Sequence, residues 1–550
     1  MRNPQMNLDI HNEITVDLFA GGGGMSVGWE LALGRSPDIA VNHDDDALSM
    51  HRANHPQTVH YRADVFEVCP REVTRGRPVG LCHVSPDCTH HSQAAGGQPR
   101  NKKLRALTWV AARWVGQVRP RILTLENVMQ ITNWGPLVAK RDPATGRVVK
   151  LNGTVAARGE RVPVQEQFLV PDKKRLGKTW RRFIALLEAQ GYTVDFWPLV
   201  AADYGAATRR KRLFLVARCD GKPIVRPPET HAANPRAGQK KYKRAADIID
   251  WSIPTKSIFG RERPLAEKTL KRIATGIHRE VLNKDQPFFV PNSVHGGAAQ
   301  AATMVQTGYG ERQGQAPRVL DIEAPAGTFV AGGVKHGIVT AYMAQMNGGR
   351  NTNPGHDVRA PVSAITNRGS QQQLVTAHLA TLRRNCYGRG AEEVLPTITA
   401  GAEHHALVSS LLAQAETDGA AGLSADETAG ALRVAAFLMR YYSEGGQWGA
   451  LEAPLDTVTT RDRLALVTVV LRGVPYVIVD IGLRMMTPRE LYRAQGFYEG
   501  YIIDRGHDGR AFSKAKQVRM VGNSVSPPPA AALLAANASD LAVTNYSMVG

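Results

Sequence analysis

The first 220 or so residues alternate short apolar runs with segments of helical spacing. Apolar runs of strand length lie at 14–19, 39–42, 79–84, 121–125, 193–198 and 213–217. Helical spacing between these runs is found at 25–33, 44–54, 103–118 and 179–190. This alternation predicts an α/β domain built on a doubly wound, mostly parallel sheet. Ligands of such open sheets bind beyond the carboxyl ends of the strands.

The pattern changes after about residue 220, where Pro, Gly and Thr separate short valine-rich runs and helical spacing is limited to 266–277 and 426–441. Apolar strands are predicted at 338–341, 374–377, 406–409 and 466–469. Each follows a residue–proline pair and, in most cases, a Thr-rich strand, as at 364–366, 397–399 and 457–459. The unit reads as a β-hairpin that recurs at a spacing of about 35 residues. The apolar stretch 464–483, interrupted at Arg472-Gly473, predicts two further strands in a hairpin.

Charge narrows the class of partner. The chain has 68 Lys and Arg against 49 Asp and Glu, a net charge of +19. Basic clusters lie at 100–105, 173–182, 209–212 and 240–244. These clusters favour a nucleic-acid partner, the alternative being solvated surface charge.

The remaining composition points to a cytoplasmic protein. Five cysteines without a regular disulfide spacing fit a reducing compartment. The first twenty residues resemble no secretory signal, and no apolar run is long and uninterrupted enough to span a membrane.

Three features bring chemistry to the predicted strand ends. A glycine-rich turn, Ala20-Gly21-Gly22-Gly23-Gly24, follows the first strand and can admit a cofactor. Cys88 stands on a proline-led turn, where a thiol can attack a carbon atom. Glu126 ends an apolar strand, a setting that raises a carboxyl pKa and suits proton delivery. This order of parts predicts a transferase.

The same segments resemble the motifs of the DNA cytosine-5 methyltransferases. Val16-Asp17-Leu18-Phe19-Ala20-Gly21-Gly22-Gly23-Gly24 is similar to their cofactor motif, and Leu125-Glu126-Asn127-Val128 to their Glu-Asn-Val motif. Thr208-Arg209-Arg210-Lys211-Arg212 resembles Gln-x-Arg-x-Arg. Further motifs in family order lie at 484–490, 495–497 and 522–525, so the resemblance covers about 1–225 and 478–540.

The resemblance implies three parts: a Rossmann-like cofactor-binding and catalytic domain at 1–225, an inserted β-rich target-recognition domain at 226–477, and a C-terminal segment at 478–550 that completes the catalytic domain. S-adenosylmethionine is the implied cofactor. Its implied contacts are Phe19, Gly21, Gly23, His43, Asp64 and Asn523.

The implied substrate is a cytosine flipped out of double-stranded DNA. Cys88 would attack C6, Glu126 would supply a proton at N3, and Arg210 and Arg212 would fix the base, the nearby phosphate and the developing charge. A monomer without an obligatory metal is expected. The resemblance is compatible with an enzyme of a restriction-modification system, a phage-encoded enzyme or an orphan methyltransferase.

The sequence departs from the family around the thiol. Asp87 replaces a proline, Thr89 a glutamine, and His90 or His91 could support the thiolate by hydrogen bonding or positive charge. Thr208 also stands where glutamine is usual, and the altered pocket leaves room for a modified pyrimidine or an unusual one-carbon donor.

Two other functions stay open. The same catalytic parts could methylate cytosine in RNA. A zinc-dependent DNA-binding module without catalysis would draw its ligands from Cys82, His83, Cys88, His90 and His91.

Overall fold

The computed structural model describes residues 13–88, 90–91, 100–283, 288–291, 298–306, 315–328, 336–345, 374–381, 389–390, 405–412, 425–442, 468–471 and 474–543. Internal contacts divide the chain into two units. The first comprises Met1–Ile249, Glu323–Val334 and Thr487–Gly550, and the second Asp250–Ile322 and Lys335–Met486. The first unit therefore joins the two ends of the chain and holds all the predicted site residues.

A seven-stranded sheet forms the first unit. Its order is β3 (Val59–Arg62), β2 (Ile39–Asn42), β1 (Ile14–Leu18), β4 (Val79–Val84), β5 (Ile122–Asn127), β9 (Lys211–Arg218) and β8 (Thr193–Val200). The strands from β3 to β5 pair in parallel, whereas β9 runs antiparallel to both β5 and β8. The predicted doubly wound, mostly parallel sheet is confirmed, and this is the fold of a Rossmann-like methyltransferase.

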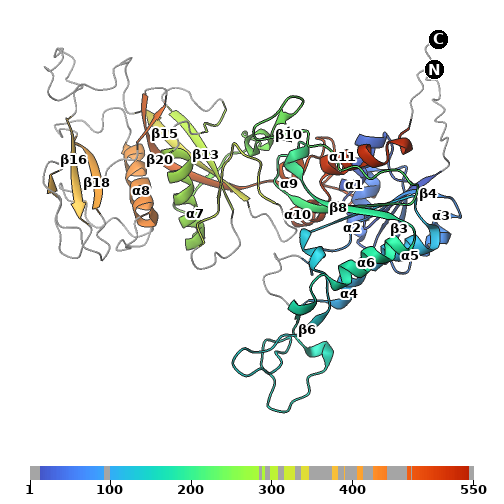
Figure 1. The fold of residues 1–550 in the computed structure, drawn as a ribbon. Coiled ribbons are helices and arrows are strands. Elements are labelled where there is room, and N and C mark those ends of the chain that lie inside the picture. Colours follow the sequence, from blue (N-terminus) through green and yellow to red (C-terminus); the bar gives the residue numbers. More distant parts are fainter. Residues whose placement is uncertain are drawn as a thin grey trace, which may run out of the picture. The chain divides into compact units, whose positions relative to one another are not determined.

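Helices cover both faces of this sheet (Figure 1). They are α1 (Gly24–Leu33), α2 (Asp45–Asn54), α3 (Pro70–Thr74), α4 (Lys102–Ala106), α5 (Val110–Val118) and α6 (Lys178–Ala189). Alternate strand residues feed two cores: Cys82 packs with Trp114 of α5 and Phe183 of α6, while its neighbour Leu81 packs with Trp29 of α1. The helix expected at 103–118 is interrupted by a 3₁₀ turn at Leu107–Trp109.

The C-terminal segment adds α9 (Pro488–Gln495), α10 (Lys514–Asn523) and α11 (Pro527–Asn537) to the first unit. Leu533 and Leu534 of α11 pack into the same core as Trp29. Gly28 lets the two helices approach, because a Cβ there would lie 2.7 Å from Ala530 Cβ.

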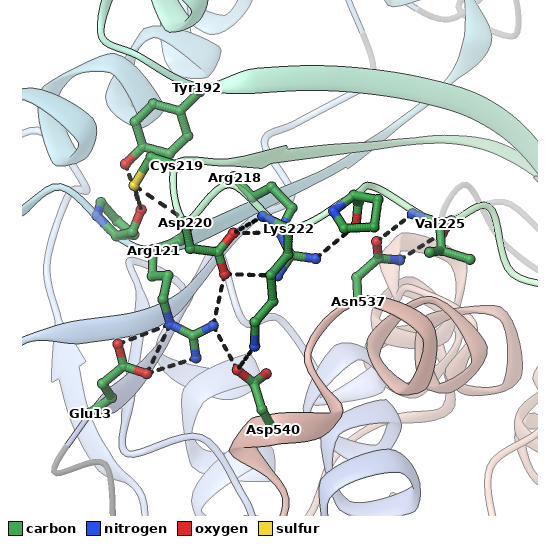
Figure 2. Close-up of polar contacts among 12 residues, drawn as sticks. Glu13, Arg121, Tyr192, Arg218, Cys219, Asp220, Lys222, Val225, Asn537 and Asp540 are labelled. Atoms are coloured by element: carbon green, nitrogen blue, oxygen red, sulfur yellow. Dashed lines mark hydrogen bonds and ion pairs between the residues drawn. The ribbon is translucent and has the colours of Figure 1, made fainter.

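An ion network also ties this segment to the sheet (Figure 2). Arg121, just before β5, pairs with Glu13 at 2.8 Å, with Asp220 at 3.0 Å and with Asp540 at 2.8 Å. Lys222 reaches the same Asp540 at 2.9 Å. The network joins residues more than 400 positions apart in sequence, and it lies at the amino end of β5, opposite the strand ends where the site is expected.

The second unit is rich in β-strands. One sheet has the order β12 (Lys256–Ser257), β20 (Val474–Met485), β15 (His336–Gln345), β13 (Ala298–Gln306) and β14 (Val319–Leu320), with β19 (Thr468–Leu471) also paired to β20. Helices α7 (Glu267–Ile277), extended by a π-helical turn at His278–Leu282, and α8 (Ala425–Tyr442) pack on this sheet. A second sheet has the order β17 (Arg389–Gly390), β16 (Leu374–Thr381) and β18 (His405–Leu412).

The two predicted helices of this unit and the β19–β20 hairpin are confirmed. The four predicted apolar strands lie wholly or partly in β15, β16, β18 and β19. Their expected Thr-rich partners at 364–366, 397–399 and 457–459 lie outside the described residues, so the hairpin repeat stays a prediction.

The remaining short strands are β6 (Leu137–Ala139) with β7 (Leu169–Pro171), and β10 (His231–Ala232) with β11 (Lys240–Lys241). Across the described parts of the chain, no helix combines the length and apolar character needed to cross a membrane.

Candidate active site

The glycine turn after β1 is held in an unusual backbone conformation. Phe19 has φ 63°, Gly21 φ 53° and Gly23 φ 91°, all in the left-handed region that favours glycine. A Cβ on Gly23 would collide with the Tyr501 hydroxyl, whereas a Cβ on Gly21 would meet only the Phe19 carbonyl, at 3.7 Å. The turn is therefore closed on the Gly23 side and open above Gly21, as a cofactor cradle requires.

Tyr501 fixes this turn from the C-terminal segment. Its hydroxyl donates a hydrogen bond of 2.6 Å to Gly22 O and lies 3.3 Å from His55 Nε2. The side chain is fully buried. Sequence reasoning gave Tyr501 no role, and only its position close after Gln495-Gly496-Phe497 could have drawn attention to it.

The other predicted cofactor residues lie at strand or helix ends. His43 follows β2 and Asp64 follows β3, and both side chains are exposed. Because β1, β2 and β3 are parallel, these positions share the sheet edge of the glycine turn. Exposed Asn523 ends α10. The neighbouring acid Asp44 is already engaged, since it caps α2 and pairs with Arg519 at 2.8 Å.

The Cys88 turn is anchored to the strands on both sides. Ser85 N donates to Leu18 O of β1 at 3.3 Å, and Asn127 Nδ2 of β5 donates to Pro86 O at 2.9 Å. Cys88 O accepts from His91 N at 3.0 Å. Buried Asn127, which the sequence marked only as part of a motif, therefore positions the turn that presents the thiol.

The charges of Glu126, Arg210 and Arg212 all act on the pKa of the Cys88 thiol. Arg212 Nε lies 3.2 Å from Glu126 Oε1, an ion pair without hydrogen-bond geometry, so that this buried oxygen has no hydrogen bond within the described residues. Arg210 Nη1 donates to Gly522 O at 3.0 Å. β5 pairs antiparallel with β9, which brings the end of β5 and the start of β9 to one edge.

Burial and charge act in opposite directions on these groups. Burial raises the pKa of Glu126, and the two arginines oppose that shift. Burial also raises the pKa of Cys88, with Arg212 and Arg210 acting against it and Glu126 and Asp87 acting with it. For Arg210, burial and the nearby Arg212 lower the pKa to about 9. The structure thus brings all four predicted catalytic residues to one electrostatic site.

Burial disfavours positive charge on the two histidines after Cys88. His91 is buried with its ring 5.8 Å from that of Trp134, and burial, together with Arg105 and Arg100, lowers its pKa to about 3. His90 Nδ1 accepts from Asn101 N at 3.2 Å, and burial lowers its pKa too. Positive charge on these histidines is therefore disfavoured, and the positive charges that lower the pKa of Cys88 are those of Arg212 and Arg210. Thr89 lies outside the described residues.

Two of the residues considered as zinc ligands have other contacts. Cys82 packs in the core between the sheet and α5, and burial raises its pKa. His83 Nδ1 lies 2.9 Å from Thr124 Oγ1, and burial lowers the His83 pKa to about 3. Among the residues that the structure describes, no three His, Cys, Asp or Glu side chains are grouped as metal ligands.

The comparison with protein families decides the class. Residues 14–134 and 168–309 match the model of the C-5 cytosine-specific DNA methylase family. The chain therefore contains a C-5 cytosine-specific DNA methylase domain. Methylases of the family act at C5 of cytosine and generally use S-adenosylmethionine as the methyl donor. The match leaves out residues 135–167 and everything after 309.

Curated relatives of this methylase are bacterial. It is 25% identical over 252 residues to the Type II methyltransferase M.AquIA of a Picosynechococcus strain, a match that covers 44% of this chain and 88% of that protein. It is 26% identical over 230 residues to the Type II methyltransferase M.AgeI of Thalassovita gelatinovora, covering 41% of this chain and 44% of the relative.

Solved structures similar to this methylase include DNMT2 of Spodoptera frugiperda, in mutant form, and Dnmt2 of S. pombe. Each is 12% identical, with TM-scores of 0.42 and 0.43, and each match covers 95% of this chain and 99% and 98% of the other. At this level of likeness, the fold assignment rests on the order and direction of the strands themselves.

Proposed function

We propose that this chain transfers a methyl group from S-adenosylmethionine to C5 of a cytosine flipped out of duplex DNA, through a transient bond between Cys88 Sγ and C6. The observation that supports this most directly is the joint placement of Cys88, Glu126, Arg210 and Arg212, whose charges act on one another within a largely buried site. The basic net charge of +19 supports a polyanionic substrate, and the Type II methyltransferases among its relatives favour DNA.

Cys88 begins the reaction as a nucleophile. Its thiolate adds to C6 of the ring, forming an S–C bond and moving electron density towards C5 and N3. Arg212 and Arg210 favour this thiolate because they lower the pKa that burial raises. After C5 has taken the methyl group, loss of the C5 proton and breakage of the S–C bond restore the ring and free the thiol.

Glu126 serves as the acid for N3. Because burial raises its pKa, the carboxyl group holds a proton more readily than an exposed one and can share it with the ring as negative charge develops there. Arg210 and Arg212 then face the substrate with fixed positive charge. A cytosine inside a duplex cannot reach the thiol, so flipping is required at a cost of a few kcal/mol in lost stacking and pairing.

The glycine turn fits S-adenosylmethionine because, among the residues that the structure describes, no side chain lies within 4 Å of a Cβ placed on Gly21. Phe19, Gly21, Gly23, His43, Asp64 and Asn523 would hold the cofactor. When bound, the cofactor supplies an electrophilic methyl group on a sulfonium sulfur. The inserted segment 226–477 would then recognise the target sequence.

A trapping experiment tests the mechanism. Genomic DNA from a host that expresses the chain is first mapped for 5-methylcytosine to find the target. Duplexes with 5-fluorocytosine at that position should then form a denaturation-resistant complex with the protein when S-adenosylmethionine is added, because fluorine at C5 blocks the final elimination. Cys88→Ala should form none. Trapping on single-stranded RNA but not on duplex DNA would refute the DNA substrate, and methylation without any trapped complex would refute the covalent step.

A further inference from the structure

Residues 136–172 form a small lobe, here called the β6–β7 lobe, of which the family model leaves out residues 136–167. At its base β6 pairs antiparallel with β7, and bridges such as Lys150↔Gln167 fold the intervening chain back on itself. The lobe contains a minimal buried set, Val149, Ala156 and Val162. Figure 1 shows it as a projection that carries the label β6.

The base of the lobe is firmly joined to the catalytic unit. Asp172 N donates to Pro136 O at 3.0 Å, and a Cβ on Gly135 would collide with Arg175 O. Arg100 N donates to Leu169 O of β7 at 2.9 Å. The lobe is thus attached to the segment that follows the Cys88 turn, on the same unit as the site.

The lobe and its base are basic, and their acids are largely engaged. Residues 135–177 contain nine Lys or Arg and four Asp or Glu, which gives nine minus four, or +5. Glu160 pairs with Lys150 at 2.5 Å, and Asp172 pairs with Arg175 at 2.6 Å. The surplus charge therefore belongs to other side chains.

Several of these side chains are exposed cations. Arg158, Arg161, Lys173 and Lys174 are exposed and form no ion pair with any residue that the structure describes. Exposed large apolar side chains gather here as well. Five of the eleven in the described residues belong to the lobe and its base: Val138, Leu151, Val155, Val164 and Leu176.

We propose that the β6–β7 lobe and Lys173-Lys174 form an arm that contacts the phosphate backbone of duplex DNA, at nucleotides other than the target cytosine. This proposal rests on the function proposed above. A second copy of this chain fits poorly, because a protein of net charge +19 would repel a surface of +5. A polyanion matches the charge, and isolated apolar side chains among cations suit contact with sugars and groove walls.

The salt dependence of DNA binding tests the arm. Arg158→Gln/Arg161→Gln removes two exposed cations, whereas the control Lys150→Gln/Glu160→Gln removes an ion pair and leaves the net charge unchanged. Binding of a long duplex containing the target is measured by fluorescence anisotropy between about 50 and about 200 mM salt. Each phosphate contact contributes about 0.9 to the slope of log Kd against log salt.

If both arginines contact phosphates, the slope should fall by about 1.8, and the change in Kd over this range should be about 12-fold smaller for the variant than for wild type. The control should keep the wild-type slope. Trapping of 5-fluorocytosine DNA at saturating concentration should be unchanged in both, because neither variant touches the catalytic residues.

The outcomes separate the two proposals. The arm proposal is overturned if both the arginine variant and Lys173→Gln/Lys174→Gln keep the wild-type slope. Normal trapping in these variants would leave the proposed methyltransferase function standing. Altered sedimentation of the variant with an unchanged slope would likewise overturn it, in favour of self-association. Failure of the wild type to bind or methylate duplex DNA would overturn both.

Discussion

Asn127 offers a direct test of how the fold positions the thiol. Its side chain is fully buried, and its Nδ2 donates the 2.9 Å bond to Pro86 O that holds the Cys88 turn against β5. Asn127→Asp keeps the size of the side chain and the bond that Oδ1 accepts from Val128 N, also at 2.9 Å. The donor to Pro86 O is lost, and an ionised carboxylate would also place a buried negative charge beside that carbonyl.

The expected loss follows from that missing donor. A buried carbonyl left without its hydrogen bond costs about 1–3 kcal/mol. If the turn instead moves to avoid this cost, Cys88 leaves its reactive position. An increase of the same size in the activation free energy would slow methyl transfer about 5- to 150-fold. The defect should be smaller at acidic pH, where a protonated carboxyl group regains a donor for Pro86 O.

Thr124→Val is the matched control, since Thr124 is equally buried on the same strand and its hydroxyl faces His83, away from the turn. Thr124→Val should lose about 1 kcal/mol of stability in urea unfolding, because one buried hydrogen bond is removed, and Asn127→Asp should lose more, because it also buries a carboxyl group. Only Asn127→Asp should slow methyl transfer from labelled S-adenosylmethionine and 5-fluorocytosine trapping. Equal rates in the two variants would refute the positioning role of Asn127.

Three further outcomes are expected. Gly23→Ala should abolish cofactor binding, measured by calorimetry, because its Cβ meets the Tyr501 hydroxyl, and Tyr501→Phe in that background should restore part of it; no restoration would place the strain in the backbone alone. Glu126→Gln should lower the turnover rate by about 10²- to 10⁴-fold. It should also remove the loss of activity that occurs as pH rises through the raised pKa of Glu126, and an unchanged pH profile would contradict its role as acid. Arg121→Met should reduce the free energy of unfolding by about 2–4 kcal/mol, since the ion network is only partly buried. Lys222 and Arg121 lower the pKa of Asp540 against the effect of burial. This stabilisation is therefore present above the unfolded pKa and is lost as pH falls through the lowered folded pKa. The loss should be smaller at about pH 2.5 than at about pH 7, and an equal loss would contradict the role of the network.

The sheet could be predicted from sequence where strands are buried on both faces. The bounds 39–42 and 79–84 agree with β2 and β4, whose residues are all buried. β3 was missed because it lies at the sheet edge, and the four residues Val59–Arg62 are exposed or half-buried, without an apolar run. The antiparallel direction of β9 was not readable either, since strand direction depends on connections and not on local hydrophobicity.

The sequence predicted the site residues that belong to motifs in family order. It did not predict the residues that position those motifs. Cys88 follows β4 and Glu126 lies near the carboxyl end of β5, and this gave their common location. The contact between Tyr501 and Gly22 joins positions 479 residues apart, which no local pattern signals. The burial of His91 against Trp134 was equally hidden from the sequence, because this contact depends on packing across a turn.

The charges around Cys88 must satisfy two opposite requirements. In the proposed mechanism the thiol has to lose a proton and Glu126 has to keep one. Burial favours the neutral form of both groups, and Arg210 and Arg212 favour the charged form of both. The geometry separates the two cases: Arg212 Nε approaches Glu126 Oε1 at 3.2 Å without hydrogen-bond geometry, so the carboxylate gains only part of what a full ion pair would give it. A phosphate or base that engages Arg212 would weaken this support further. Substrate binding should then favour protonation of Glu126 at the step that needs it, while Arg210, bonded to Gly522 O, stays in place for the thiolate.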